Sequence, residues 1–271
     1  MTITSAKPWV RSEQIGQCPV PPKDQEWVEK WMRWCVKEFG LEVVKREIAL
    51  PVSDFFPPGF VGTPVQVGEL VRRVCSLMGV DPDELSVEYF ESPEQESHAL
   101  RSNRDKHRTV GMYRKADGHA VIELDLREAE EPAVLAAIIA HELGHARLLG
   151  EDRIQGIEVD HEKLTGLVTV FLGMGVFTAN AAYRFTKSVH GFSVLPLGDL
   201  TERELTGTAL DPTRHLGYLT ERQFGYALAC YCRLRGETDP LWSRHLEPGA
   251  RAALKQGLQY FADRPPTAQH R

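Results

Sequence analysis

The chain is poor in cysteine, and its few cysteines lack the spacing of a structural cluster. Five cysteines in 271 residues are odd in number, and no two of them form a CxxC pair. Neither a disulfide framework nor a cysteine-ligated zinc site is therefore indicated. A reducing cytoplasm is the simplest interpretation of this usage. The five residues are Cys18, Cys35, Cys75, Cys230 and Cys232.

Two further absences narrow the class of protein. Positive charge is not in excess, since the net charge is −6. This balance argues against non-specific binding of nucleic acid. Residues 1–14 contain no continuous apolar segment, which argues against a secretory signal. With 42% hydrophobic and 26% charged residues, the composition is that of an ordinary globular protein.

One segment has the length and composition of a membrane span. Residues Leu164 to Tyr183 carry no charge, and about 20 apolar residues suffice to cross a bilayer. However, glycines, threonines and an asparagine interrupt it, and charged residues stand directly at both ends. We expect Gly173 and Gly175 to let a helix pack closely against a neighbour. The segment is therefore predicted to be the buried central helix of the fold, and a membrane location is disfavoured.

The most informative motif is His141-Glu142-Leu143-Gly144-His145, an HExxH sequence. One helical turn separates the two histidines, so both imidazoles project from one face and can bind a single metal ion. Glu142 lies between them, where its carboxylate can take the proton of a water molecule at the metal. The pattern is typical of a zinc-dependent hydrolase.

The residues around this motif predict a helix over 132–149. Pro132 follows two glutamates, which is a favourable helix start, and Gly150 follows the last apolar residues as a stop. The segment ahead of the motif consists of alanine, valine, leucine and isoleucine. Because unpaired polar groups are costly to bury, a metal would account for two histidines and a glutamate in so apolar a helix.

A catalytic zinc normally has three protein ligands, so a third is expected. The metzincin pattern HExxHxxGxxH is not met, since Leu148 and Glu151 stand where it requires glycine and histidine. A second helix is predicted to begin near residue 160, and its first turn contains Glu162. We favour Glu162 as the third ligand. The alternatives are Glu158, Asp160 and His161.

With these residues the chain resembles the gluzincin metallopeptidases, particularly their small members. The resemblance rests on the HELGH motif and on Glu162, and it covers about thirty residues. It implies that His141, His145 and Glu162 bind Zn²⁺, that Glu142 is the general base, and that the substrate is a peptide or protein. It also implies a zincin-like fold.

The chain departs from the gluzincin pattern at one position. Gluzincins often read ExxxD, with the aspartate supporting a ligand histidine, but Gly166 stands four residues beyond Glu162. Either Asp160 or Asp199 orients the histidine instead, or Glu162 is not the ligand, or zinc binding is weak. A metal-stabilised binding or regulatory module with little activity is the alternative function. Candidates for stabilising an oxyanion are His190, His215 and Tyr218.

The remaining segments predict an α+β fold in a single domain. We expect a flexible arm over 1–24, a catalytic domain over 25–261 with helical extensions, and a polar tail over 262–271. Helices are expected at 25–39, 63–78, 219–235 and 248–261, and a strand at 43–51.

A small, mostly antiparallel sheet is expected to pack on the HExxH helix and the central apolar helix. Its strands are predicted at 85–91, 109–114 and 120–126, and the last two are joined by a hairpin turn at Ala116-Asp117-Gly118. The strand 119–124 would border the cleft, where an extended substrate could add as another strand.

Overall fold

The computed structural model shows an α+β protein with seven α-helices and three strands in its described residues. The helices are amphipathic or wholly apolar, and they enclose one continuous hydrophobic core. The described residues are 16–91, 111–116, 119–154, 161–190 and 219–264. The helices are α1 (Pro22–Phe39), α2 (Pro64–Met78), α3 (Pro132–His145), α4 (His161–Phe171), α5 (Gly175–His190), α7 (Glu221–Arg235) and α8 (Pro248–Ala262).

The strands are β1 (Leu85–Phe90), β2 (Gly111–Ala116) and β3 (His119–Asp125), and they form one sheet in the order β1-β3-β2. β2 pairs antiparallel with β3, as the predicted hairpin requires, whereas β1 runs parallel to β3. The sheet is therefore mixed, and the expectation of a mostly antiparallel sheet was wrong. The strand predicted to border the cleft is β3, but β3 lies in the centre of the sheet, and β1 and β2 are its edge strands.

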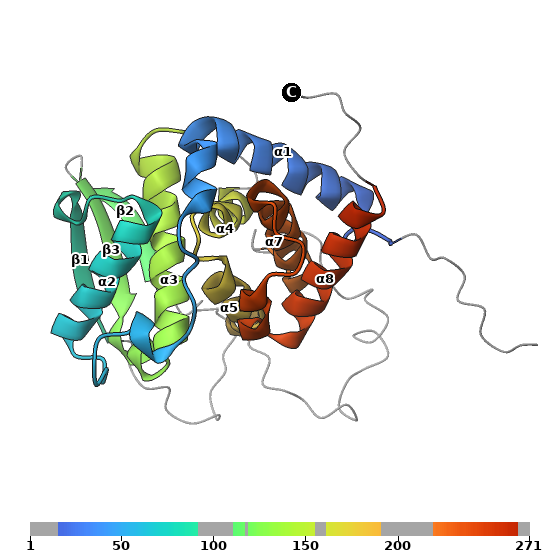
Figure 1. Cartoon of the computed structure of the whole chain (residues 1–271). Helices are drawn as coiled ribbons and strands as arrows, with labels where there is room; N and C mark the ends of the chain where they lie inside the picture. The colour runs from blue at the N-terminus through green and yellow to red at the C-terminus, as the bar shows by residue number, and fades with distance from the viewer. Residues whose placement is uncertain (1–15, 92–110, 117–118, 155–160, 191–218, 265–271) are drawn as a thin grey trace, which may run out of the picture.

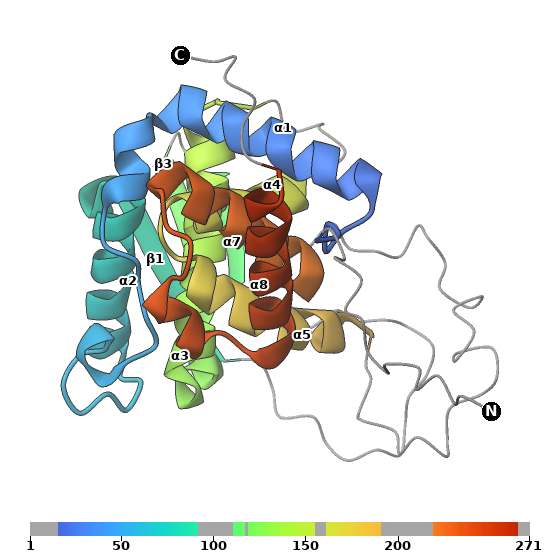
Figure 2. The same ribbon diagram turned by 45° about the vertical axis from the view of Figure 1, so that its right-hand side comes forward.

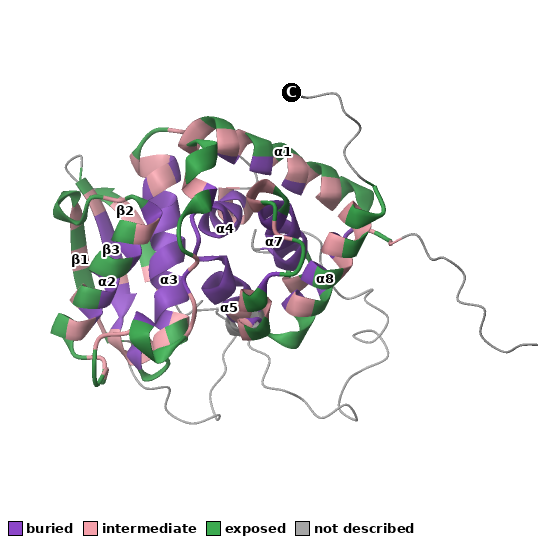
Figure 3. Ribbon diagram, in the orientation of Figure 1, coloured by how far each residue is buried: buried purple, intermediate pink, exposed green. Residues whose placement is uncertain are grey.

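Helix α3 lies between the sheet and the remaining helices (Figure 1). The sheet and α2 stand on one side of it, while α4, α5 and α7 stand on the other, with α1 and α8 on the outside (Figures 1 and 2). Colouring by burial shows that α3, α4 and α7 are the innermost helices (Figure 3). Every residue of α3 from Leu135 to His145 is buried, so its polar residues lie inside the protein.

Sequence signals at the helix ends are met in the structure. Thr63 and Gln66 form a reciprocal capping box at the start of α2, and Thr220 and Gln223 form another at the start of α7. The predicted HExxH helix is confirmed, and its last turn, Ala146–Gly150, widens to a π-helix. α1 begins at Pro22, so the boundary predicted at residue 24 falls inside its first turn.

The strand predicted at 43–51 is absent, and this prediction was wrong. Residues Leu41–Lys45 form a 3₁₀ helix instead, and the following chain is extended without a strand partner in the described part of the protein. The carbonyl of Val44 accepts hydrogen bonds from the side chains of Tyr231 and Arg235. Side chains of α7 thus satisfy the backbone that a sheet would otherwise have satisfied.

The single helix predicted over 164–183 is two helices, α4 and α5, and this prediction was wrong as well. The break lies at Gly173, whose φ of 92° is outside the helical region. Its carbonyl accepts a hydrogen bond of 3.0 Å from the backbone N–H of Ala49. The one described helix long and apolar enough to cross a membrane is Pro132–Gly150, of which 72% is buried inside the protein. A helix in a protein core has this composition too.

We expect Gly173→Ala to lower the free energy of unfolding by about 1–2 kcal/mol, because an L-residue is strained at positive φ. An added Cβ would also lie 3.2 Å from the carbonyl oxygen of Glu47. Urea denaturation measures the change. The matched control is Gly166→Ala within α4, where the Cβ has ordinary contacts at 3.4 Å, and this variant should gain up to about 1 kcal/mol. Equal stability of the two variants would contradict the assignment of the break to Gly173.

Candidate metal centre

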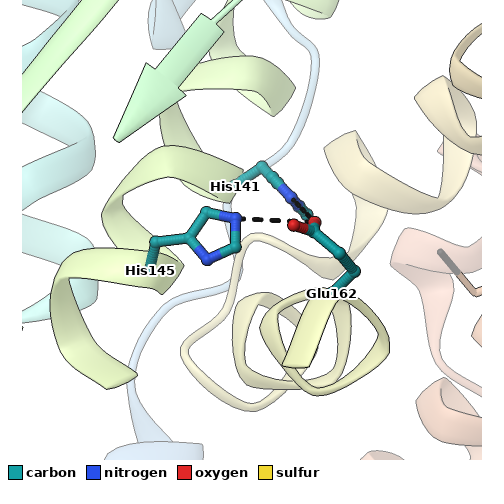
Figure 4. A group of neighbouring side chains, drawn as sticks. All are labelled: His141, His145 and Glu162. Atoms are coloured by element: carbon teal, nitrogen blue, oxygen red, sulfur yellow. Dashed lines mark hydrogen bonds and ion pairs between the residues drawn. The ribbon is translucent and has the colours of Figure 1, made fainter. Parts of the chain in front are cut away.

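Helix α3 places His141 and His145 on the same face, one turn apart. Their rings are perpendicular, with centroids 4.9 Å apart. Both residues are buried, with exposures of 7% and 8%. The HExxH motif therefore gives the expected juxtaposition, and the two imidazoles point into the space between α3 and α4 (Figure 4).

Glu162 extends from the first turn of α4 to both histidines (Figure 4). Its Oε2 atom lies 2.9 Å from Nε2 of His141 and 3.5 Å from Nε2 of His145. One ligand atom from each of the three residues lies within 4.8 Å of the others. The residue favoured as third ligand is thus brought to the two histidines from a separate helix.

The other candidates for the third ligand are placed differently. His161 lies next to the cluster, with its Nε2 atom 3.2 Å from Oε1 of Glu162 and its ring centroid 5.8 Å from that of His145. It is not a member of the three-residue group. Glu158 and Asp160 lie outside the described residues, as do Asp199, His215, Tyr218 and the side chain of His190.

Mutual contact perturbs the ionisation of the cluster. Burial alone would raise the pKa of Glu162, but hydrogen bonds and charge from His141 and His145 outweigh it and hold this pKa well below its usual range. For His145, burial would lower the pKa, and the hydrogen bond and charge of Glu162 raise it overall. The site is therefore built around one carboxylate that is anionic at neutral pH.

Glu142 differs from Glu162 in its surroundings. It is 7% exposed, and burial raises its pKa although the two histidines and the backbone of Tyr113 act in the opposite direction. A buried carboxylate with a raised pKa holds a proton more readily than an exposed one. The environments of Glu142 and Glu162 therefore shift the pKa values of the two carboxyl groups in opposite directions, a common arrangement in acid–base sites.

Strand β2 forms the wall of the site opposite α4. The ring of Tyr113 stacks on that of His145, with centroids 6.2 Å apart and an interplanar angle of 25°. Its hydroxyl group is buried without a hydrogen-bond partner in the described structure, and it lies beside Gly150, where an added Cβ would be 2.9 Å from it. The Tyr113 ring therefore lines the site beside His145.

Helix α4 approaches α3 very closely at Gly144. A Cβ atom on this glycine would lie 2.7 Å from Cγ2 of Thr165, so a larger residue would force the helices apart. The glycine inside the HExxH motif thus permits the crossing that brings Glu162 to the histidines. Thr165 is fully buried at this crossing, and its hydroxyl lies 3.2 Å from Nδ1 of His145.

The Cβ direction of Gly166 in α4 points toward the segment that leads into α7. A Cβ atom there would meet Leu219 and Phe224 at 3.4 Å. An aspartate at this position would enter an apolar contact between α4 and the start of α7. Position 166 therefore packs against the start of α7 in this structure.

Sequence reasoning missed Thr165 and Tyr113. Thr165 is three residues after Glu162, a spacing that places both on one helix face, so this signal was present in the sequence. Tyr113 could not be assigned in this way, because its position depends on which strand lies at the edge of the sheet.

The donor set fits a zinc ion. Two imidazole nitrogens and one carboxylate oxygen are a common ligand set for catalytic zinc, and the three donors converge here within 4.8 Å. Comparison with protein-family models, curated proteins and solved structures finds no match. The resemblance to gluzincins therefore rests on the motif and on this geometry.

We expect protein purified without chelators to contain about one zinc per chain, because three convergent ligands suffice for a catalytic zinc site. His141→Ala and Glu162→Ala should each lose the metal, since each removes one of the three ligands. Elemental analysis measures the content. His161→Ala is the matched control, since it removes an adjacent imidazole and should retain the zinc. Loss of zinc in this control would indicate that His161 also binds the metal.

Proposed function

We propose that this protein is a zinc-dependent hydrolase, a zincin-like metallopeptidase of the gluzincin type, that cleaves a peptide or amide bond. The observation that carries the proposal is the convergence of His141, His145 and Glu162 beside Glu142. The helix that supplies both histidines also supplies the candidate base, while the third ligand comes from the next helix in the chain. We expect the protein to act in the cytoplasm.

Metal binding and proton transfer are assigned to different residues. His141, His145 and Glu162 would hold the zinc, which when bound polarises a carbonyl and lowers the pKa of water to about 7. Glu142 accepts the proton of the attacking water and then delivers it to the leaving amine. Its burial supports this role, because burial raises its pKa and a carboxylate of higher pKa is the stronger base toward a water proton.

A peptide substrate would reach the site along β2. This strand pairs with β3 on one side, and no described strand covers its other side. Tyr113 in β2 lies against His145, so the outer edge of this strand runs beside the ligands. An extended peptide can add to such an edge through backbone hydrogen bonds. We therefore propose β2 for this role in place of residues 119–124.

The alternative of an inactive binding module depended on two sequence observations. The first was Gly166, whose Cβ direction faces Leu219 and Phe224. The second was the lack of a convincing oxyanion donor, and His190, His215 and Tyr218 remain predictions for that role. A protease embedded in the membrane through 164–183 is disfavoured, because this segment bends at Gly173.

We expect Glu142→Gln to reduce hydrolysis by at least about 100-fold, because general acid–base catalysis contributes about 10²–10⁴-fold. The amide cannot accept the proton of the water molecule. Zinc content should be nearly unchanged, because Glu142 is not one of the three converging ligands. Cleavage of a fluorogenic peptide mixture and elemental analysis measure the two quantities.

Glu130→Gln is the control for this experiment, since it makes the same chemical change at an exposed position shortly before α3. It should leave both hydrolysis and zinc content at the wild-type level. Loss of zinc together with activity in Glu142→Gln would refute the assignment of Glu142 as base. Wild-type protein that binds zinc and cleaves no peptide in the mixture would favour the binding module.

A further inference from the structure

The hydroxyl group of Thr165 lies between a backbone carbonyl and a ligand histidine. Its Oγ1 atom is 2.8 Å from the carbonyl oxygen of His161, one turn earlier in α4, and 3.2 Å from Nδ1 of His145 in α3. Thr165 has no exposed surface, so water does not compete for either contact. We propose that Thr165 is a positioning residue that fixes the tautomer of His145 and leaves its Nε2 atom available to bind metal.

The direction of the two hydrogen bonds follows from the atoms present. A carbonyl oxygen can only accept, so the single hydroxyl proton of Thr165 is donated to His161. The hydroxyl can then offer only a lone pair to His145, and Nδ1 must supply the proton. A neutral imidazole carries one N–H. With that proton on Nδ1, the lone pair is on Nε2, the atom that faces Glu162.

This arrangement is built into the packing of two helices. A threonine hydroxyl commonly bonds the carbonyl four residues earlier, so α4 alone orients the group. The close approach at Gly144 then brings it to the histidine. Mutation of a residue that orients a ligand histidine typically lowers metal affinity or activity by about 10–100-fold. Thr165 thus takes the place that gluzincins give to the aspartate of ExxxD, although it acts on the second histidine of the motif.

The helix supplies a matched control in Thr169. This residue is also fully buried, and its hydroxyl donates to the carbonyl of Gly166 and contacts the hydroxyl of Thr178. It lies one turn beyond Thr165, and its hydroxyl group bonds none of the three ligand residues in the described part of the chain. Replacing either threonine by valine removes a buried hydroxyl from α4, and only the change at Thr165 removes the partner of His145.

The test compares wild-type protein with Thr165→Val, Thr165→Ser and Thr169→Val. Zinc affinity is measured by competition with a chromophoric chelator, and this readout rests on the proposed function. The tautomer of His145 is measured by ¹⁵N NMR of metal-free protein in a Glu162→Ala background, where no carboxylate accepts a proton from Nε2, at a pH where the imidazole is neutral. We expect Thr165→Val to weaken zinc binding about 10–100-fold and to lose the Nδ1–H preference. Thr165→Ser should restore both, and Thr169→Val should match wild type.

Two results would overturn the proposal. One is an unchanged Nδ1–H tautomer in Thr165→Val, and the other is an equal loss of zinc affinity in Thr169→Val, which would indicate a packing effect. If wild-type protein binds no zinc, the proposed function fails, while the NMR measurement still decides the role of Thr165. Should Thr165→Val not fold, Thr165→Ala removes the same hydroxyl without adding bulk.

Discussion

The close crossing of α3 and α4 at Gly144 is the contact on which the site depends. Each of these helices alone carries an incomplete set of ligands, because His141 and His145 are on one and Glu162 is on the other. The 2.7 Å separation between a would-be Cβ of Gly144 and Thr165 shows how little space the crossing leaves. The fold supports this contact from both sides, since α3 is held by the sheet and α4 by α1 and α7. The candidate metal site is therefore a product of tertiary packing.

Burial makes the polar residues of α3 costly unless they satisfy one another. Transfer of an unpaired polar group into a protein interior costs about 1–3 kcal/mol by mutational data, and α3 is apolar enough to pass for a membrane span. Glu162 offsets part of this cost by contacting both histidines, and Thr165 satisfies Nδ1 of His145. A dication among these donors would offset more, because it would neutralise the carboxylate and occupy the Nε2 lone pairs. Such a dependence of a buried polar cluster on its ligand is a reason to look for the metal in the purified protein.

The sequence predicted most helices because their end signals are local. Thr63 with Gln66, and Thr220 with Gln223, cap their helices through residues three positions apart. The failures involve contacts between distant segments. Residues 43–51 have the composition of a strand, but the side chains of Tyr231 and Arg235 take their backbone acceptors. The break at Gly173 receives a hydrogen bond from Ala49, more than a hundred residues earlier, and the parallel pairing of β1 with β3 likewise leaves no local signal.

The same distinction explains what could be predicted of the site. His141, Glu142 and His145 follow from helical periodicity, and Glu162 follows from its place in a first helical turn. The orientation of α4 about its own axis does not follow from local sequence, and it decides which residues support the ligands. In this structure Thr165 faces His145 while Gly166 faces Leu219 and Phe224. Positions three and four residues after Glu162 both lie near its helix face, so local sequence does not decide which of them reaches a ligand. That could be judged only once both helices were in place.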